Sequence, residues 1–149
     1  MSDPELVVER LSEYSPEAAA DLGRLMPHLS ERMGSEPISE ELLRAIIDSP
    51  HHEQIVARLD GVVVGAATMS LIMGPCAGRK GELEDFVTSP EVRGHGIGDK
   101  IWQEMLKWCQ EQGINFGFTS RPSREAAHRF YKDHRATVRD TTVFQVNVD

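Results

Sequence analysis

The sequence predicts an α/β fold in which a mixed sheet is covered by helices. Two amphipathic helical patterns near the N-terminus precede three strand patterns joined by short turns, which predict an antiparallel meander. A strand–helix–strand pattern in the second half predicts parallel pairing, because such a connection returns the chain in its original direction. The chain has 149 residues, 40% of them hydrophobic, and is therefore long enough to bury a core.

The expected helices are delimited by capping residues and by apolar spacing. Ser15 and Pro16 are typical of the first residues of a helix, and apolar residues follow them at intervals of three and four. Gly113 is typical of the residue that ends one. The expected helices cover residues 15–29, 39–49, 98–112 and 123–134.

The expected strands are apolar or alternating runs between turn signals. Asp60-Gly61 is a strong signal for a two-residue hairpin, and Gly74-Pro75 predicts a second turn. The last run, Thr142–Val148, alternates polar and apolar residues, and we expect its edge to pair with a second copy in a homodimer. The expected strands cover residues 5–11, 54–59, 62–73, 82–87, 115–119 and 142–148.

The charge is distributed unevenly along the chain. The net charge is −8, and residues 1–60 hold 13 acidic and 5 basic residues, whereas the remainder holds 11 of each. A duplex-binding surface needs a basic stripe, so we expect no nucleic-acid partner. The acidic half indicates either a cationic partner or a face kept polar for solubility.

Residues 1–149 are expected to form a single domain, because no repeat or linker interrupts them. Met1–Glu5 lacks a signal-peptide pattern, and the longest apolar run, Val62–Met73, is shorter than the roughly 20 residues of a membrane span. We therefore expect a cytoplasmic protein without a membrane partner. Cys76 and Cys109 are expected to be reduced, buried thiols, and no Cys/His spacing predicts a metal site.

The chemistry is expected in residues 82–100, where a strand, a glycine-rich turn and a helix follow one another. Gly94, Gly96 and Gly98 allow backbone N–H groups to gather at one point, to which the next helix directs its own unpaired N–H groups. Such a site binds phosphate or pyrophosphate. The segment has neither a P-loop nor a dinucleotide fingerprint, and the remaining pattern is Arg-x-x-Gly-x-Gly from Arg93.

Two motifs resemble those of the GNAT N-acetyltransferases. Arg93-Gly94-His95-Gly96-Ile97-Gly98, preceded by Val87–Glu91, is similar to their acetyl-CoA-binding motif, and Thr119–Tyr131, with its Ala-x-x-Phe-Tyr ending, is similar to their second motif. The resemblance covers nearly the whole chain. It implies a GNAT-like fold with about six to seven strands and about four helices. It also implies transfer of an acetyl group from acetyl-CoA to a primary amine of a small molecule or peptide.

The resemblance implies a site for acetyl-CoA as co-substrate, without a metal ion. The pyrophosphate would bind the glycine turn and the helix N-terminus, and the pantetheine would pair with strand backbone near a bulge. Ser123 and Arg124 would reach a phosphate or the pantetheine. The implied co-substrate residues are Phe86, Val87, Thr88, Arg93, Gly94, His95, Gly96, Ile97, Gly98, Ser123 and Arg124.

Two residues are expected to take part in catalysis. Tyr131 matches the family tyrosine that protonates the leaving thiolate, a role that suits a phenol. Glu84 is the expected general base, because relatives with a Glu-Asp pair in this strand place the glutamate at the active site. Strand alternation would put Asp85 on the opposite face, and burial beside Phe86 would raise the pKa of Glu84. The alternatives are a water relay as base, or a Glu84 that only orients an acceptor ammonium or pairs with a nearby basic group.

The sequence departs from the family pattern at several positions. Arg135 and Ala136 stand where the family has Gly-Phe, and Thr119 stands where some relatives have a glutamate. These departures motivate an alternative function, a non-catalytic module that binds acyl-CoA. The acceptor side, near residues 24–41, belongs to the acidic half and favours a cationic amine or a basic peptide.

Overall fold

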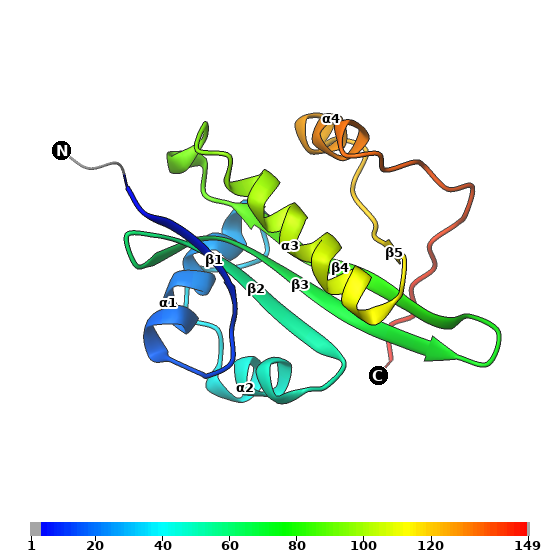
Figure 1. Ribbon diagram of the computed structural model, residues 1–149, viewed down its shortest axis with the longest axis horizontal. Coiled ribbons are helices and arrows are strands. Elements are labelled where there is room, and N and C mark those ends of the chain that lie inside the picture. Colours follow the sequence, from blue (N-terminus) through cyan, green and yellow to red (C-terminus); the bar gives the residue numbers. More distant parts are fainter. Residues whose placement is uncertain (1–3, 149) are drawn as a thin grey trace. The chain divides into compact units, whose positions relative to one another are not determined.

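The computed structural model describes residues 4–148 (Figure 1). The chain forms two compact units, one ending at Phe118 and the other beginning at Thr119. The second unit contains α4 (Glu125–Asp133). The first unit contains β1 (Leu6–Arg10), α1 (Pro16–Leu25), the 3₁₀-helix η1 (Met26–His28), α2 (Glu40–Asp48), β2 (His52–Leu59), β3 (Val62–Gly74), β4 (Gly78–Thr88), the 3₁₀-helix η2 (Pro90–Val92), α3 (Ile97–Gln112) and β5 (Phe116–Gly117).

The strands form one mixed sheet in the order β1-β2-β3-β4-β5. β1 to β4 pair antiparallel in sequence order, and β5 pairs parallel with β4. The meander and the later parallel pair are therefore confirmed, as is the mixed α/β class. The sheet of the described residues has five strands, fewer than the six or seven expected.

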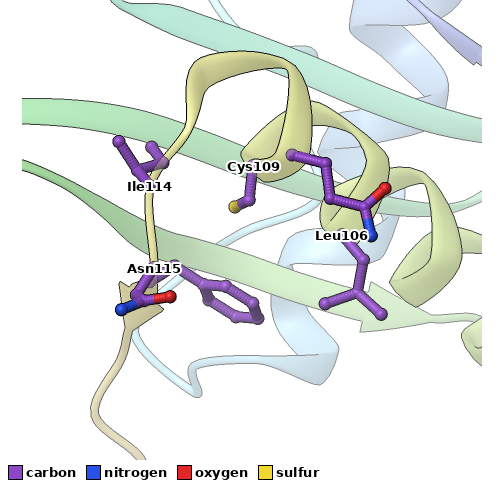
Figure 2. A pocket seen from close by; sticks show the side chains of 6 residues that line it. Leu106, Cys109, Ile114 and Asn115 are labelled. Atoms are coloured by element: carbon purple, nitrogen blue, oxygen red, sulfur yellow. The ribbon is translucent and has the colours of Figure 1, made fainter.

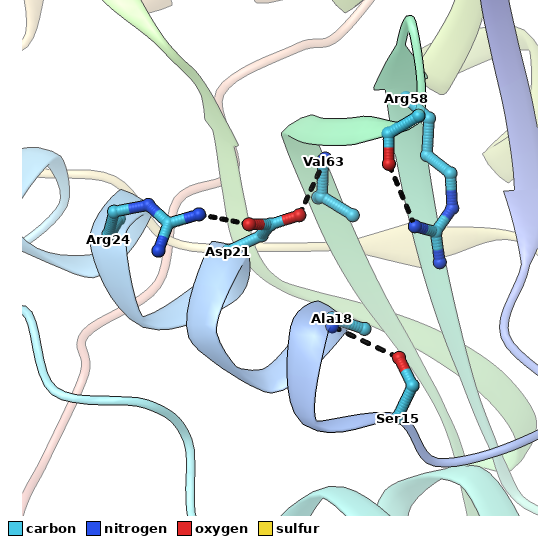
Figure 3. A network of polar contacts seen from close by, with 7 residues as sticks. Ser15, Ala18, Asp21, Arg24, Arg58 and Val63 are labelled. Carbon is cyan, nitrogen blue, oxygen red and sulfur yellow. Dashed lines mark hydrogen bonds and ion pairs between the residues drawn. The ribbon is translucent and has the colours of Figure 1, made fainter.

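The predicted helix caps are present. The Ser15 side chain accepts a hydrogen bond from the Ala18 N–H at 3.1 Å (Figure 3), and Ser39 accepts one from Leu42 at 3.2 Å. Gly113 ends α3 in the left-handed conformation, with φ +68°. Each cap satisfies backbone groups that a helix end leaves without an intrahelical partner.

Helices cover both faces of the sheet. Ala66 of β3 belongs to the apolar core shared with α1 and α2, whereas a Cβ on its neighbour Gly65 would meet Ile97 and Ile101 of α3. Adjacent residues of a strand point to opposite faces, so α1 and α3 lie on opposite faces. The buried side of α3 consists of Ile97, Ile101, Trp102, Met105, Trp108 and Cys109.

A buried carboxylate attaches α1 to the sheet. Asp21 accepts a hydrogen bond from the Val63 N–H of β3 at 3.0 Å and pairs with Arg24 through its other oxygen (Figure 3). On another side of α1, a Cβ at Gly23 would lie 2.1 Å from the Glu36 carbonyl oxygen, which is possible only for glycine. These contacts fix the position of α1 and of the segment at Glu36 that packs across it.

Two predictions about the end of the chain differ from the structure. Residues 142–148 form no strand or helix, and Phe144 is 88% and Val148 92% exposed. β5 comprises two residues instead of the expected 115–119. A strand requires a hydrogen-bonded neighbour as well as an alternating sequence, and residues 142–148 pair with no described strand. The homodimer expected through this segment stays a prediction.

The remaining observations concern cysteines and membranes. Cys109 is buried as expected, but Cys76 is exposed, because it lies at the turn between β3 and β4. Within residues 4–148, no helix combines the length and the apolar character needed to cross a bilayer.

Candidate active site

A β-bulge interrupts β4 at its centre. Ala66 of β3 is opposite Val87 of β4. Thr68 lies two residues after Ala66, but its partner Glu84 lies three residues before Val87. One extra residue is therefore inserted in β4. Asp85 takes the left-handed conformation, with φ +50°, which aspartate tolerates better than most residues do. The bulge bends β4 immediately before the predicted co-substrate residues.

The ladder between β4 and β5 covers only the part of β4 before the bulge. Among the described residues, the β4–β5 ladder consists of the pairs Gly81↔Phe116 and Glu82↔Gly117. The Ser89 N–H donates to Val64 of β3 at 2.7 Å, and main-chain groups alternate between the two edges of a strand. The main chain at Val87 therefore faces β3, whereas that at Thr88 faces the opposite edge of β4.

The glycine turn connects this edge to α3. Gly94 and Gly96 have φ values of +89° and +69°, so a side chain there would be strained. Gly96 is the N-cap of α3, and no side chain caps the helix. Arg93 and His95 are exposed, whereas Ile97 is buried and anchors the first turn, which also contains Gly98. A helix N-terminus without a side-chain cap can bind an anion.

Glu84 lies on the face of the sheet that α1 covers. It is opposite Thr68, which shares a face with Ala66 of the α1 core. The side chain is exposed, yet partial burial raises its pKa, and the negative charges of Asp85 and Glu82 raise it further. The bulge at Asp85 directly follows Glu84 in β4.

The second unit holds Ser123, Arg124 and Tyr131. Tyr131 is the buried residue of α4, at 8% exposure, while Ser123 is exposed and Arg124 is half-buried before the helix. Arg135 follows the end of α4 in the left-handed conformation, with φ +71°. The site residues are therefore divided: Glu84 and the segment Phe86–Gly98 adjoin one another in the first unit, and the other three belong to the second.

A pocket of about 280 Å³ lies at the opposite end of α3 from the glycine turn (Figure 2). Leu106, Cys109, Ile114 and Asn115 are among the side chains around it. Burial raises the pKa of the Cys109 thiol to about 11. The thiol is therefore protonated at neutral pH, which does not favour a nucleophile.

Solved structures with a similar fold include several acetyltransferases. An aminoglycoside acetyltransferase from an uncultured soil metagenomic sample, solved with trehalose, is 20% identical, with a TM-score of 0.82 and 97% of each chain covered. An aminoglycoside N-acetyltransferase in complex with CoA is 14% identical, with a TM-score of 0.78 and 98% of this chain and 97% of that chain covered. A putative acetyltransferase from Agrobacterium tumefaciens str. C58 is 20% identical, with a TM-score of 0.77, and the match covers 95% of this chain and 99% of that chain. At these identities the similarity establishes the fold.

The family is established independently by sequence. Residues 23–134 match the model of the Acetyltransferase (GNAT) family, and this range includes the β4 bulge, the glycine turn and α4. Acyl transfer is the chemistry of that family. Since the match extends over most of the chain, the protein is a member of the GNAT acetyltransferase family.

Proposed function

We propose that the protein transfers an acetyl group from acetyl-CoA to a primary amine of a small molecule. The observation that carries this proposal is the end of β4 beyond its ladder with β5, which leads through the glycine turn to the N-terminus of α3, where no side chain caps the helix. An open strand edge can pair with the amides of an extended ligand, and a helix N-terminus can bind its phosphates. Acetyl-CoA combines both features in one molecule.

In this proposal, acetyl-CoA lies along the first unit from β4 to α3. The pantetheine amides pair with the main chain at Phe86 and Thr88, next to Val87. The pyrophosphate accepts hydrogen bonds from the turn formed by Arg93–Gly98, where Arg93 adds positive charge. Ser123 and Arg124 supply further contacts to a phosphate or to the pantetheine. No metal ion is required for this binding mode.

The proposed reaction is a direct attack in a ternary complex. The neutral amine nitrogen forms a bond to the thioester carbonyl carbon, and the tetrahedral intermediate then loses the CoA thiolate as the C–S bond breaks. Tyr131 donates its phenolic proton to the sulfur. The proton lost by the amine goes to Glu84, directly or through water. The products are the acetylated amine and CoA.

The surroundings of Glu84 support its role as base. A carboxylate with an ordinary pKa is too weak a base at neutral pH, and a raised pKa brings it closer to the useful range. Partial burial and the charges of Asp85 and Glu82 act in this direction. The same three carboxylates also favour an ammonium group nearby, so positioning of a cationic acceptor is the second role that we propose for Glu84.

A cationic small amine is the proposed acceptor. Glu84 faces the layer formed by α1, and η1 also contacts β4, so an acceptor on this face meets the acidic half of the chain. The soil aminoglycoside acetyltransferase was also solved in complex with sisomicin, an amine with several cationic groups. Its identity of 20% leaves the acceptor of this protein to be determined by experiment.

The experiment is acetyl transfer from acetyl-CoA to a panel of amines, measured as thiol release and as the mass of the product. The panel contains sisomicin, spermidine, n-butylamine and a lysine-rich peptide, with glutamate as an anionic control. We expect turnover with the polycationic amines. Binding of acetyl-CoA without turnover on any amine would instead support a non-catalytic acyl-CoA-binding module, the alternative that the strained Arg135 favours.

A further inference from the structure

A row of three polar side chains crosses the sheet on the face that α1 covers. Gln54 of β2 is opposite Thr68 of β3, and Thr68 is opposite Glu84 of β4. Directly opposite residues point to the same face, with Cβ atoms about 4.5 to 5.5 Å apart. Gln54 is buried at 5% exposure, Thr68 is half-buried and Glu84 is exposed. The row therefore leads from the protein interior to the proposed base.

The Gln54 amide fixes the direction of the Thr68 hydroxyl. Its nitrogen donates to the carbonyl oxygens of Ile55 and Ala67, both at 3.3 Å. A flipped amide would place its oxygen against these two oxygens, so the main chain sets its orientation. The amide oxygen accepts the Thr68 hydroxyl proton at 2.8 Å. A hydroxyl has one proton and two lone pairs, so toward any further partner Thr68 is an acceptor only.

A hydroxyl that only accepts, on the same face as a carboxylate, suits a ligand with several N–H donors. A primary ammonium has three such donors, whereas the carboxylate of an anionic ligand has none. Such a ligand can donate to Thr68 and Glu84 at the same time. The row therefore favours the cationic form of a primary amine.

We propose that Thr68 accepts a hydrogen bond from the acceptor amine while Glu84 takes the proton that the amine loses. The ammonium N–H bond to the departing proton breaks and an O–H bond to Glu84 forms, while another N–H stays on Thr68. This orients the nitrogen lone pair for attack on the thioester carbonyl carbon. Thr68 itself transfers no proton. This role rests on the proposed function, whereas the hydrogen bond between Thr68 and Gln54 does not.

Two substitutions at Thr68 separate the hydroxyl from the shape of the side chain. Valine has the shape of threonine without the hydroxyl, and serine keeps the hydroxyl without the methyl group. The matched control is Ser70→Ala, because Ser70 lies on the same face of β3, two residues further along and opposite Glu82. This control also removes one half-buried hydroxyl, but not the one that Gln54 holds.

The first measurement is the Tm without ligand, in a double-mutant cycle. Thr68→Val leaves the buried Gln54 oxygen without its proton donor, so we expect a larger loss of Tm in the wild-type background than in Gln54→Leu. Thr68→Ser should keep most of the Tm. An equal loss in both backgrounds overturns the fixed hydroxyl. If Gln54→Leu does not fold, equal Tm values of Thr68→Val and Thr68→Ser overturn it instead.

The second measurement is the steady-state rate of acetyl transfer to spermidine. We expect kcat/KM for spermidine to fall about tenfold in Thr68→Val, and no more than about twofold in Thr68→Ser and Ser70→Ala. The KM for acetyl-CoA should be the same in all three variants, which a general loss of structure would not allow. Unchanged kcat/KM in Thr68→Val, or an equal loss in Ser70→Ala, overturns the proposal. If Thr68→Val does not fold, Thr68→Ala replaces it.

A third measurement separates failure of this inference from failure of the proposed function. If the wild-type protein acetylates no amine of the panel, the proposed function fails. The ammonium site is then decided by NMR titration with spermidine, observed at the methyl resonance of Thr68. A saturable shift that sodium chloride at equal ionic strength does not produce supports the site, and no such shift overturns it.

Discussion

The region from β4 to α3 and the region after Phe118 both carry sequence patterns typical of regular structure. In the first region, strand, bulge, turn and helix all form, and each is held by contacts with other elements, as at Ser89 and Trp102. In the second region α4 forms, but residues 142–148 form no regular structure and are exposed, although they alternate polar and apolar residues.

This difference shows that a helix can be predicted from neighbouring residues, whereas a strand also depends on residues that are distant in the sequence. A helix satisfies its own backbone through bonds four residues apart, so local signals suffice to place α4. A strand is completed only by a neighbour that is distant in the sequence. The candidate site is divided between the same two regions, because the residues proposed to bind acetyl-CoA in β4 and the glycine turn lie in the first and Tyr131 lies in the helix of the second.

The largest effect is expected from Tyr131→Phe, which asks whether the second region takes part in the chemistry. Removal of the phenolic proton should lower kcat about 100-fold or more, with the Kd for acetyl-CoA unchanged, because general acids contribute 100- to 10,000-fold. The measurement is steady-state thiol release. Tyr14→Phe is the control, since the chain has two tyrosines and Tyr14 lies before α1, under the Arg44 guanidinium. Equal rates in the two variants would remove Tyr131 from the reaction.

A smaller effect, on binding, is expected from Gly96→Val in the first region. A β-branched residue at φ +69° strains the turn and displaces the N–H groups of α3, so the Kd for acetyl-CoA should rise about 10- to 100-fold. Gly61→Val is the control: Gly61 also has a positive φ, +86°, with open space around it, but lies in the β2–β3 turn. An equal loss of affinity in both variants would mean that strain alone, and not the anion site, is responsible.

A pH-dependent effect is expected at Glu84. Its pKa is raised in the folded state, so the folded protein binds more protons than the unfolded chain does between the ordinary and the raised pKa. Stability therefore falls as the pH rises through this window. Glu84→Gln should have a higher Tm than the wild-type protein at neutral pH, and the difference should vanish below the ordinary carboxyl pKa.

The same variant is expected to lose activity, in contrast to its gain in stability. If Glu84 is the base, wild-type kcat rises with pH through its raised pKa, and Glu84→Gln loses this limb together with activity. Glu82→Gln serves as the control, because Glu82 lies two residues away and only contributes charge. A pH profile that is the same in wild type and Glu84→Gln would assign the proton to a water relay.

The smallest effect is expected from Arg135→Gly. The left-handed residue after α4, with φ +71°, costs about 1 kcal/mol when it is not glycine. The variant should therefore be more stable by up to about that amount in thermal unfolding. Lys132→Gly, inside the helix, should instead lose about 1 kcal/mol. A loss of stability in Arg135→Gly would contradict the assigned backbone conformation.

Much of the fold follows from local sequence signals. Ser15, Ser39 and Gly113 define helix ends, and Asp60-Gly61 defines a hairpin, because the free energies involved depend on a few adjacent residues. The glycine turn is predicted for the same reason, since positive φ values at Gly94 and Gly96 are a property of glycine itself.

The parts that the sequence does not predict depend on distant contacts. The resemblance implies a bulge, but its position at Asp85 is visible only in the register against β3, and its one local signal is an aspartate that tolerates a left-handed backbone. The role of Gly23 depends on Glu36 crossing α1. Thr68 is indistinguishable from any strand threonine until Gln54 and Glu84 are placed beside it.

The central claim is that the end of β4 beyond its ladder with β5 binds acetyl-CoA together with the glycine turn. The most direct test is calorimetric titration of the wild-type protein with acetyl-CoA, CoA and ATP. We predict binding of acetyl-CoA and CoA at a single site and none of ATP, because ATP offers phosphates to the turn but no pantetheine to the strand. No heat with millimolar acetyl-CoA, or equal affinity for ATP, would contradict the claim.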